Sequence, residues 1–172
     1  KGTYFEIGTW RGESVANIAT IMQKCYTLNI TNEELKHLGC SDEYIEQQGL
    51  YSREIPNITH LRGNSLTFDF SPYYGKCDMV FVDGGHDYQT VMKDTQTAFQ
   101  LLKDENSCIV WHDYLLTNGN IRYEVLLAIM DGTPKEKISK VCHVSNTISA
   151  IYYPKNFSKT KNQTTPNKSF NV

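Results

Sequence analysis

Apolar residues along this chain alternate between short continuous runs and stripes of helical period. Residues 79–82, within a strand predicted at 78–82, form one such run, which is followed by an acid and two glycines. A continuous apolar run bounded by glycine is typical of a strand buried on both faces of a parallel sheet. Comparable runs predict strands at residues 3–7, 25–28, 59–61 and 107–111.

Between these strands, apolar residues at i, i+3, i+4 and i+7 predict helices packed on a sheet. One stripe comprises Val15, Ile18, Ala19 and Met22, and a second comprises Val91, Thr95, Ala98, Phe99 and Leu102. A further helix is predicted at residues 121–130, with Gly132 as its C-cap. Shorter helical pieces are expected near 33–38 and 42–48, where Thr31 and Glu34 form a capping-box start.

The end of the chain predicts a hairpin followed by a polar tail. Strands at residues 137–144 and 147–153 are joined tightly at Ser145 and Asn146, which is typical of an antiparallel pair. Residues 155–172 contain few apolar side chains, and we predict that they are disordered. The whole pattern predicts an α/β fold in one domain, residues 1–154, with a doubly wound, mostly parallel, seven-stranded sheet and a C-terminal antiparallel hairpin.

Charge and composition exclude some classes of partner. The formal net charge of -2 argues against a nucleic-acid-binding surface, which normally carries a basic excess. No apolar run approaches the roughly 20 residues of a membrane span, and no segment resembles a signal peptide. The five cysteines are scattered without a Cys-x-x-Cys pair. They indicate buried free thiols in a reducing compartment, so we expect a cytoplasmic protein without a membrane or nucleic-acid partner.

The first strand runs into a glycine-containing turn, with Glu6, Gly8, Gly12 and Ser14 in the pattern Glu-x-Gly-x-x-x-Gly-x-Ser. Glycines at a strand-to-helix turn let the backbone pass close to a ligand. The pattern is not the dinucleotide fingerprint, because Trp10 occupies the position of its second glycine. A nucleotide-dependent oxidoreductase is therefore disfavoured.

This turn resembles motif I of class I S-adenosylmethionine-dependent methyltransferases. Residues 81–88 and 109–114 add a resemblance to the small-molecule O-methyltransferases among them, and the resemblance covers most of residues 3–153. It implies a Rossmann-like methyltransferase fold. It also implies transfer of a methyl group from S-adenosylmethionine to a hydroxyl oxygen of a small molecule.

The resemblance implies which residues bind the cofactor. The end of the second strand carries Asn29, where the family normally has an acid for the ribose hydroxyls, so a charge-assisted hydrogen bond is forfeited. Asn64 and Ser65 match the position that borders the adenine, and Asp83 is a neighbour of the cofactor. The first turn contributes Glu6, Gly8, Thr9, Gly12 and Ser14.

Metal-dependent members of the family hold a divalent ion with an acid after strand four and an adjacent pair after strand five. Asp83, His112 and Asp113 match these ligands, and His86 matches the base that removes the substrate proton, where those enzymes use lysine. Magnesium prefers oxygen ligands, whereas imidazole suits zinc, iron and other transition ions. Either a softer ion binds or the site is free of metal.

Other interpretations stay open for the same residues. Asp83 could cap the following helix, His86 could be a surface loop residue, and His112 with Asp113 could form a structural turn. The chain as a whole could be a non-catalytic module that binds the cofactor or a nucleotide without turnover. The sequence leaves open the hydroxyl acceptor and the oligomeric state, a homodimer included.

Overall fold

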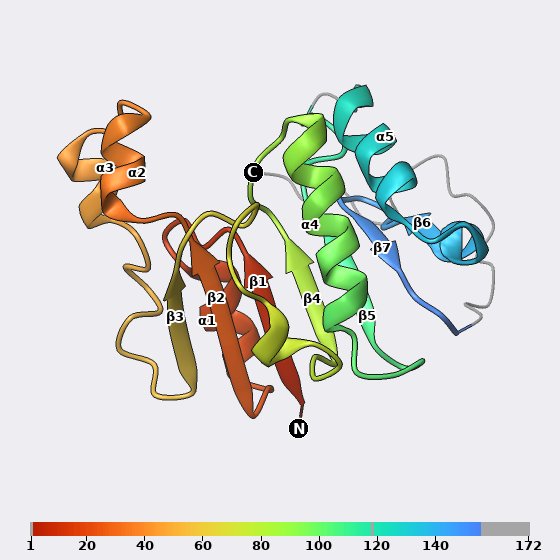
Figure 1. Ribbon diagram of the computed structural model, residues 1–172, viewed down its shortest axis with the longest axis horizontal. Helices are drawn as coiled ribbons and strands as arrows, with labels where there is room; N and C mark the ends of the chain where they lie inside the picture. Colours follow the sequence, from red (N-terminus) through yellow and green to blue (C-terminus); the bar gives the residue numbers. More distant parts are fainter. Residues whose placement is uncertain (1, 118, 156–172) are drawn as a thin grey trace, which may run out of the picture.

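A computed structural model of the chain describes residues 2–117 and 119–155. These residues form a seven-stranded sheet in the order β3-β2-β1-β4-β5-β7-β6 (Figure 1). The strands are β1 Thr3–Ile7, β2 Lys24–Asn29, β3 Ile58–Arg62, β4 Met79–Val82, β5 Cys108–Trp111, β6 Val141–His143 and β7 Ala150–Tyr152. Strands β1 to β5 pair in parallel, and β7 is antiparallel to both β5 and β6. The predicted fold class is confirmed.

Helices cover the two faces of the sheet in separate layers. The helices are α1 Glu13–Ala19, α2 Asn32–His37, α3 Asp42–Glu46, α4 Tyr88–Leu101 and α5 Tyr123–Gly132. Helices α4 and α5 lie side by side on one face, and α1 packs on the other (Figure 1). Successive residues of a strand point to opposite faces, so Phe5 joins the core beneath α4 while Tyr4 joins the core beneath α1.

The predicted bounds of both hairpin strands are wrong, and the second strand is only Ala150–Tyr152 because residues 147–149 lie in the turn. Residues 135–140 form a 3-10 helix, Lys135–Lys140, and the first strand is only Val141–His143. Pro134 opens that segment, and its carbonyl accepts a hydrogen bond from the Lys137 N–H at 2.8 Å, which winds the chain instead of extending it. The antiparallel pairing of the hairpin itself is confirmed. The predicted tail lies outside the described residues, apart from Lys155.

Gly132 is the last residue of α5, not its C-cap, which is Thr133. A Cβ atom on Gly132 would lie 2.8 Å from both the Met92 carbonyl oxygen and the Cβ of Thr95 on α4. This glycine is needed for close packing between the two helices, and not for a left-handed turn. The helix also begins at Tyr123, two residues later than predicted, because Ile121 pairs with Leu115 in an isolated bridge.

The connection from β2 to β3, residues 30–57, carries α2 and α3 beyond the carboxyl edge of the sheet (Figure 1). Its capping box is confirmed, because the Thr31 hydroxyl accepts from the Glu34 N–H and the Glu34 carboxylate accepts from the Thr31 N–H. The connection is tied to the first turn by a backbone hydrogen bond of 2.7 Å from Gly49 N–H to the Trp10 carbonyl. None of the helices in the described residues has both the length and the apolar character needed to cross a membrane.

Candidate functional site

A cavity of about 680 Å³ opens at the carboxyl edge of the sheet, between the strand ends and the connection that carries α2 and α3. The strand order changes direction between β1 and β4, and ligands of open α/β sheets bind at such a point. The cavity is lined by five residues that the sequence assigned to the cofactor: Gly8, Asn29, Asn64, Ser65 and Asp83.

The turn after β1 and the turn after β4 touch at this edge. Gly8 has a φ of +99°, and a Cβ atom there would collide with the Asp83 carbonyl oxygen and lie 2.8 Å from the Gly84 nitrogen. The close approach therefore requires glycine at position 8. Trp10 has a φ of 46°, unusual for a bulky residue, and its ring packs on Tyr44 of α3 at the cavity wall.

Glu6 lies beneath the first turn and does not line the cavity. Its carboxylate is fully buried and accepts hydrogen bonds from the hydroxyls of Tyr4, Ser14 and Thr27 at 2.7, 2.6 and 2.9 Å. Burial raises its pKa to about 7 although these three donors favour the ionised form. Thr9 is also buried and shares a 2.7 Å hydrogen bond with Thr27.

Glu6, Thr9, Gly12 and Ser14 therefore form the support behind the cavity wall. The connection from β2 to β3 packs closely against the turn after β1. Position 12 requires glycine, because a Cβ atom there would collide with the Ser52 hydroxyl.

Asn29 ends β2 at the cavity wall and donates a 2.5 Å hydrogen bond from its amide to Gln48 Oε1. Gln48 could not be identified from the sequence, because it lies in the connection, which carries no ligand-binding motif. Glu34 is an acid that lines the same cavity, but its carboxylate is engaged in the capping box. The amide of Asn29 is thus oriented by Gln48 at the position where a ribose-binding acid was expected.

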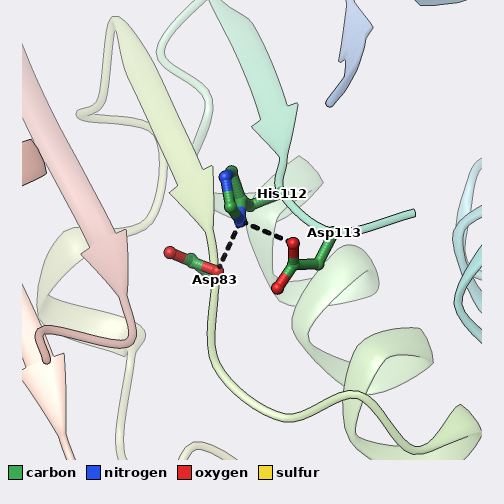
Figure 2. Close-up of side chains that lie close together, drawn as sticks. All are labelled: Asp83, His112 and Asp113. Atoms are coloured by element: carbon green, nitrogen blue, oxygen red, sulfur yellow. Dashed lines mark ion pairs between the residues drawn. The ribbon is translucent and has the colours of Figure 1, made fainter. Parts of the chain in front are cut away.

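Beside the cavity, Asp83 at the end of β4 meets His112 and Asp113 at the end of β5 (Figure 2). The parallel register places Val82 opposite Trp111, which brings the next residues together. His112 Nδ1 lies 3.3 Å from Asp83 Oδ1 and 3.1 Å from Asp113 Oδ1. The hydrogen bond to Asp83 raises the pKa of His112, with further support from Asp113, although burial opposes it.

His86 joins this cluster from the other side, because its Nε2 lies 3.0 Å from Asp113 Oδ2. Its side chain is 44% exposed, so the ring is both anchored and open to a ligand. The N-cap of α4 is Asp87, whose carboxylate accepts from the Thr90 N–H. The interpretation of Asp83 as a helix cap is therefore wrong.

The cluster fits the donor set of a divalent ion. One nitrogen of His112 and one oxygen each of Asp83 and Asp113 lie within 4.8 Å of one another, and all three residues are half-buried. A mixed nitrogen and oxygen set suits a transition ion better than magnesium. His112 must be neutral to ligate, whereas its two carboxylate neighbours favour the protonated ring.

Three solved structures share this fold with the chain at low sequence identity. The O-methyltransferase NovP has a TM-score of 0.65 and 11% identity, over 91% of this chain and 73% of its own. Spermidine synthase from Thermotoga maritima has a TM-score of 0.54 and 10% identity, over 90% and 53%. Phosphoethanolamine N-methyltransferase 1 of Haemonchus contortus, solved with phosphoethanolamine and S-adenosylhomocysteine, has a TM-score of 0.52 and 14% identity, over 67% and 22%.

For the last two, the chain spans about half of the solved protein or less. A search of curated proteins found no match. The model of one protein family, described as a methyltransferase domain, matches residues 5–114. The match spans more than half of the 172 residues and includes both strand-end turns and the cluster beside the cavity. The chain therefore belongs to this family of methyltransferase domains.

Proposed function

We propose that the chain transfers the methyl group of S-adenosylmethionine to a hydroxyl oxygen of a small molecule. One observation carries the proposal: Asp83 lines a cavity of ligand size and also belongs to the cluster that includes His112 and Asp113. A volume of about 680 Å³ lies within the range of small-molecule sites. The oxygen acceptor is supported by the fold shared with NovP, which is named an O-methyltransferase.

In this proposal the cavity binds the cofactor across the two touching turns. The backbone at Gly8 lies against the methionine part, the Asn29 amide hydrogen-bonds the ribose hydroxyls, and Ser65 borders the adenine. A neutral amide makes weaker hydrogen bonds to hydroxyls than a carboxylate does. Cofactor affinity therefore depends more on the shape of the cavity than on charge.

His86 acts as the base for the acceptor hydroxyl. Its Nε2 lies against Asp113 Oδ2, so Nε2 carries the proton of that hydrogen bond and Nδ1 keeps a free lone pair. The acceptor O–H gives its proton to Nδ1, and the oxygen attacks the methyl carbon. The carbon–sulfur bond breaks, and its electron pair stays on sulfur, which becomes the thioether of S-adenosylhomocysteine. Asp113 stabilises the imidazolium that forms.

Asp83, His112 and Asp113 are the residues that would hold a divalent ion in this proposal. A bound cation beside the acceptor lowers the pKa of its hydroxyl group. His86 contacts the same carboxylate, Asp113, that would ligate the ion. The base and the ion would therefore act on one acceptor oxygen.

The test compares His86→Ala with His143→Ala, an exposed histidine of β6 that contacts Tyr114. We expect His86→Ala to lower kcat by about 100-fold or more, since that is the usual contribution of a general base. Its affinity for S-adenosylhomocysteine, measured by calorimetry, should stay unchanged, and His143→Ala should behave as the wild type in both assays. If the His86→Ala variant kept full turnover, His86 would be excluded as the base.

The alternative is a module that binds the cofactor without turnover. It is favoured by Asn29, which stands where the family normally has an acid that binds the ribose. The two are separated by incubating the wild type with S-adenosylmethionine and panels of phenol and sugar acceptors. Formation of S-adenosylhomocysteine that depends on an acceptor supports the methyltransferase. Binding of the cofactor without any product across the panels supports the alternative.

A further inference from the structure

Asp94 is a buried acid that the proposed chemistry does not use. It lies in α4, its side chain is 1% exposed, and neither carboxylate oxygen has a hydrogen-bond partner among the described residues. Glu6 is equally buried but accepts three hydrogen bonds. A buried carboxylate without donors destabilises a fold, whereas an apolar residue of similar size at the same place does not. The position of Asp94 therefore calls for a functional explanation.

The surroundings of Asp94 belong to the wall of the cavity. A Cβ atom on Gly84 would lie 3.4 Å from Asp94 Oδ2, so the carboxylate sits directly beneath the turn after β4. The Ser65 hydroxyl, in the turn after β3, faces the same carboxylate and partly offsets the rise in its pKa that burial causes. Thr90, one helical turn before Asp94, lines the cavity with Ser65 and Gly84. Asp94 thus lies behind both turns that line this end of the cavity.

The turn that carries Ser65 is held together by its own hydrogen bonds. Its hydrogen bonds run within the segment: Leu66 N–H donates to Asn64 Oδ1 at 3.0 Å, and Phe68 N–H donates to the Asn64 carbonyl at 2.8 Å. Gly63, with a φ of +154°, precedes it and is bonded to the end of β2 through the Asn29 carbonyl. A small shift of this turn toward α4 brings the Ser65 hydroxyl into hydrogen-bonding distance of Asp94 without breaking these bonds.

We propose that Asp94 is a positioning residue for the adenosyl end of the cofactor. When a ligand fills the cavity, Ser65 donates a hydrogen bond to Asp94, and the turn at residues 64–66 is held against Gly84. The hydrogen bond from Ser65 replaces part of the hydration that the Asp94 carboxylate loses on folding. Because this hydrogen bond forms when the ligand binds, it makes the free energy of binding more favourable. This inference rests on the proposed function, because it assumes an adenosyl ligand.

The experiment measures dissociation constants by calorimetry for S-adenosylhomocysteine and for 5′-methylthioadenosine, which lacks the amino-acid part. We expect Asp94→Ala and Ser65→Ala each to weaken both ligands by about tenfold, since a hydrogen bond to a charged group is lost. The double variant should be no weaker than either single variant, because both changes remove one interaction. Asp94→Asn should restore most of the affinity, because its amide oxygen still accepts from Ser65.

The matched control is Thr95→Ala. Thr95 is the neighbouring buried residue of α4, and its hydroxyl accepts a 2.9 Å hydrogen bond from Trp111 Nε1. Neither residue is among those that line the cavity. We expect this variant to lower the melting temperature and leave both dissociation constants unchanged.

Three results would overturn the inference: wild-type affinity in Asp94→Ala, additive losses in the double variant, or a loss for S-adenosylhomocysteine alone. If Asp94→Ala does not fold, Asp94→Leu provides the same comparison with Ser65→Ala, because its apolar side chain fills the buried position and accepts no hydrogen bond. A wild-type chain that binds neither ligand would instead refute the proposed function.

Discussion

Replacing Asp94 by Asn tests the energetic cost of its burial. Burial raises the pKa of this carboxyl from 3.8 to about 7. The unfolded chain loses the proton near the ordinary value, whereas the native chain keeps it to about pH 7. Between these pH values the native state binds more protons, so the free energy of unfolding falls as pH rises, by about 1.4 kcal/mol per unit.

From pH 5 to the native pKa the interval is about two units, which amounts to about 3 kcal/mol of lost stability. Asn does not titrate, so the Asp94→Asn variant does not lose this stability. Its free energy of unfolding, relative to that of the wild type, should therefore rise by about 3 kcal/mol between pH 5 and pH 8. Glu6 has a similar pKa of about 7, but it is present in both proteins and cancels in the comparison.

Urea unfolding at several pH values, followed by tryptophan fluorescence, gives this difference directly. Trp111 is buried next to α4 and reports on the same core. If the difference between the two proteins stays constant from pH 5 to pH 8, then Asp94 does not titrate abnormally, and the reasoning from its burial is refuted.

Further predictions concern the cavity and the cluster. Gly8→Ala should lower the affinity for S-adenosylhomocysteine by about 100-fold, because the two turns must move apart by about 1 Å. Gly39→Ala is the control: Gly39 also has a positive φ, but a Cβ atom there would lie within 4 Å of no atom in the described part of the chain, so the affinity should stay unchanged. Equal losses in the two variants would refute the collision at Gly8. Asn29→Asp should lower the dissociation constant of S-adenosylhomocysteine by about tenfold in calorimetry, since it adds a charge-assisted hydrogen bond to the ribose. An unchanged dissociation constant would mean that the ribose binds elsewhere. Dialysis against a chelator should lower the turnover rate, and added transition ions should restore it better than magnesium; an unaffected rate would indicate metal-free catalysis.

The five parallel strands and the meeting of Asp83 with His112 were predictable from the sequence, because the end of each strand follows from a local pattern. Apolar runs ended by glycine identified β1 and β4, and parallel strands put their carboxyl ends at one edge. That alone brings Asp83 and His112 together.

What could not be predicted depends on contacts between distant segments. The placement of Glu6 behind the cavity wall rests on hydroxyls of Tyr4, Ser14 and Thr27, which no local pattern connects to it. Asp94 stands within a helical stripe whose apolar members gave the only visible pattern, so its burial was missed. The local sequence around Gly132 predicts a helix cap, whereas its close packing against Thr95 on α4 explains why glycine stands there.

The most direct test of the central claim, that the cavity binds an adenosyl cofactor, is a calorimetric titration of the wild-type chain with S-adenosylhomocysteine. We predict saturable binding of one ligand per chain, weakened about 100-fold in Gly8→Ala and unchanged in Gly39→Ala. The absence of detectable heat with millimolar ligand, under conditions in which the chain is folded, would contradict the claim.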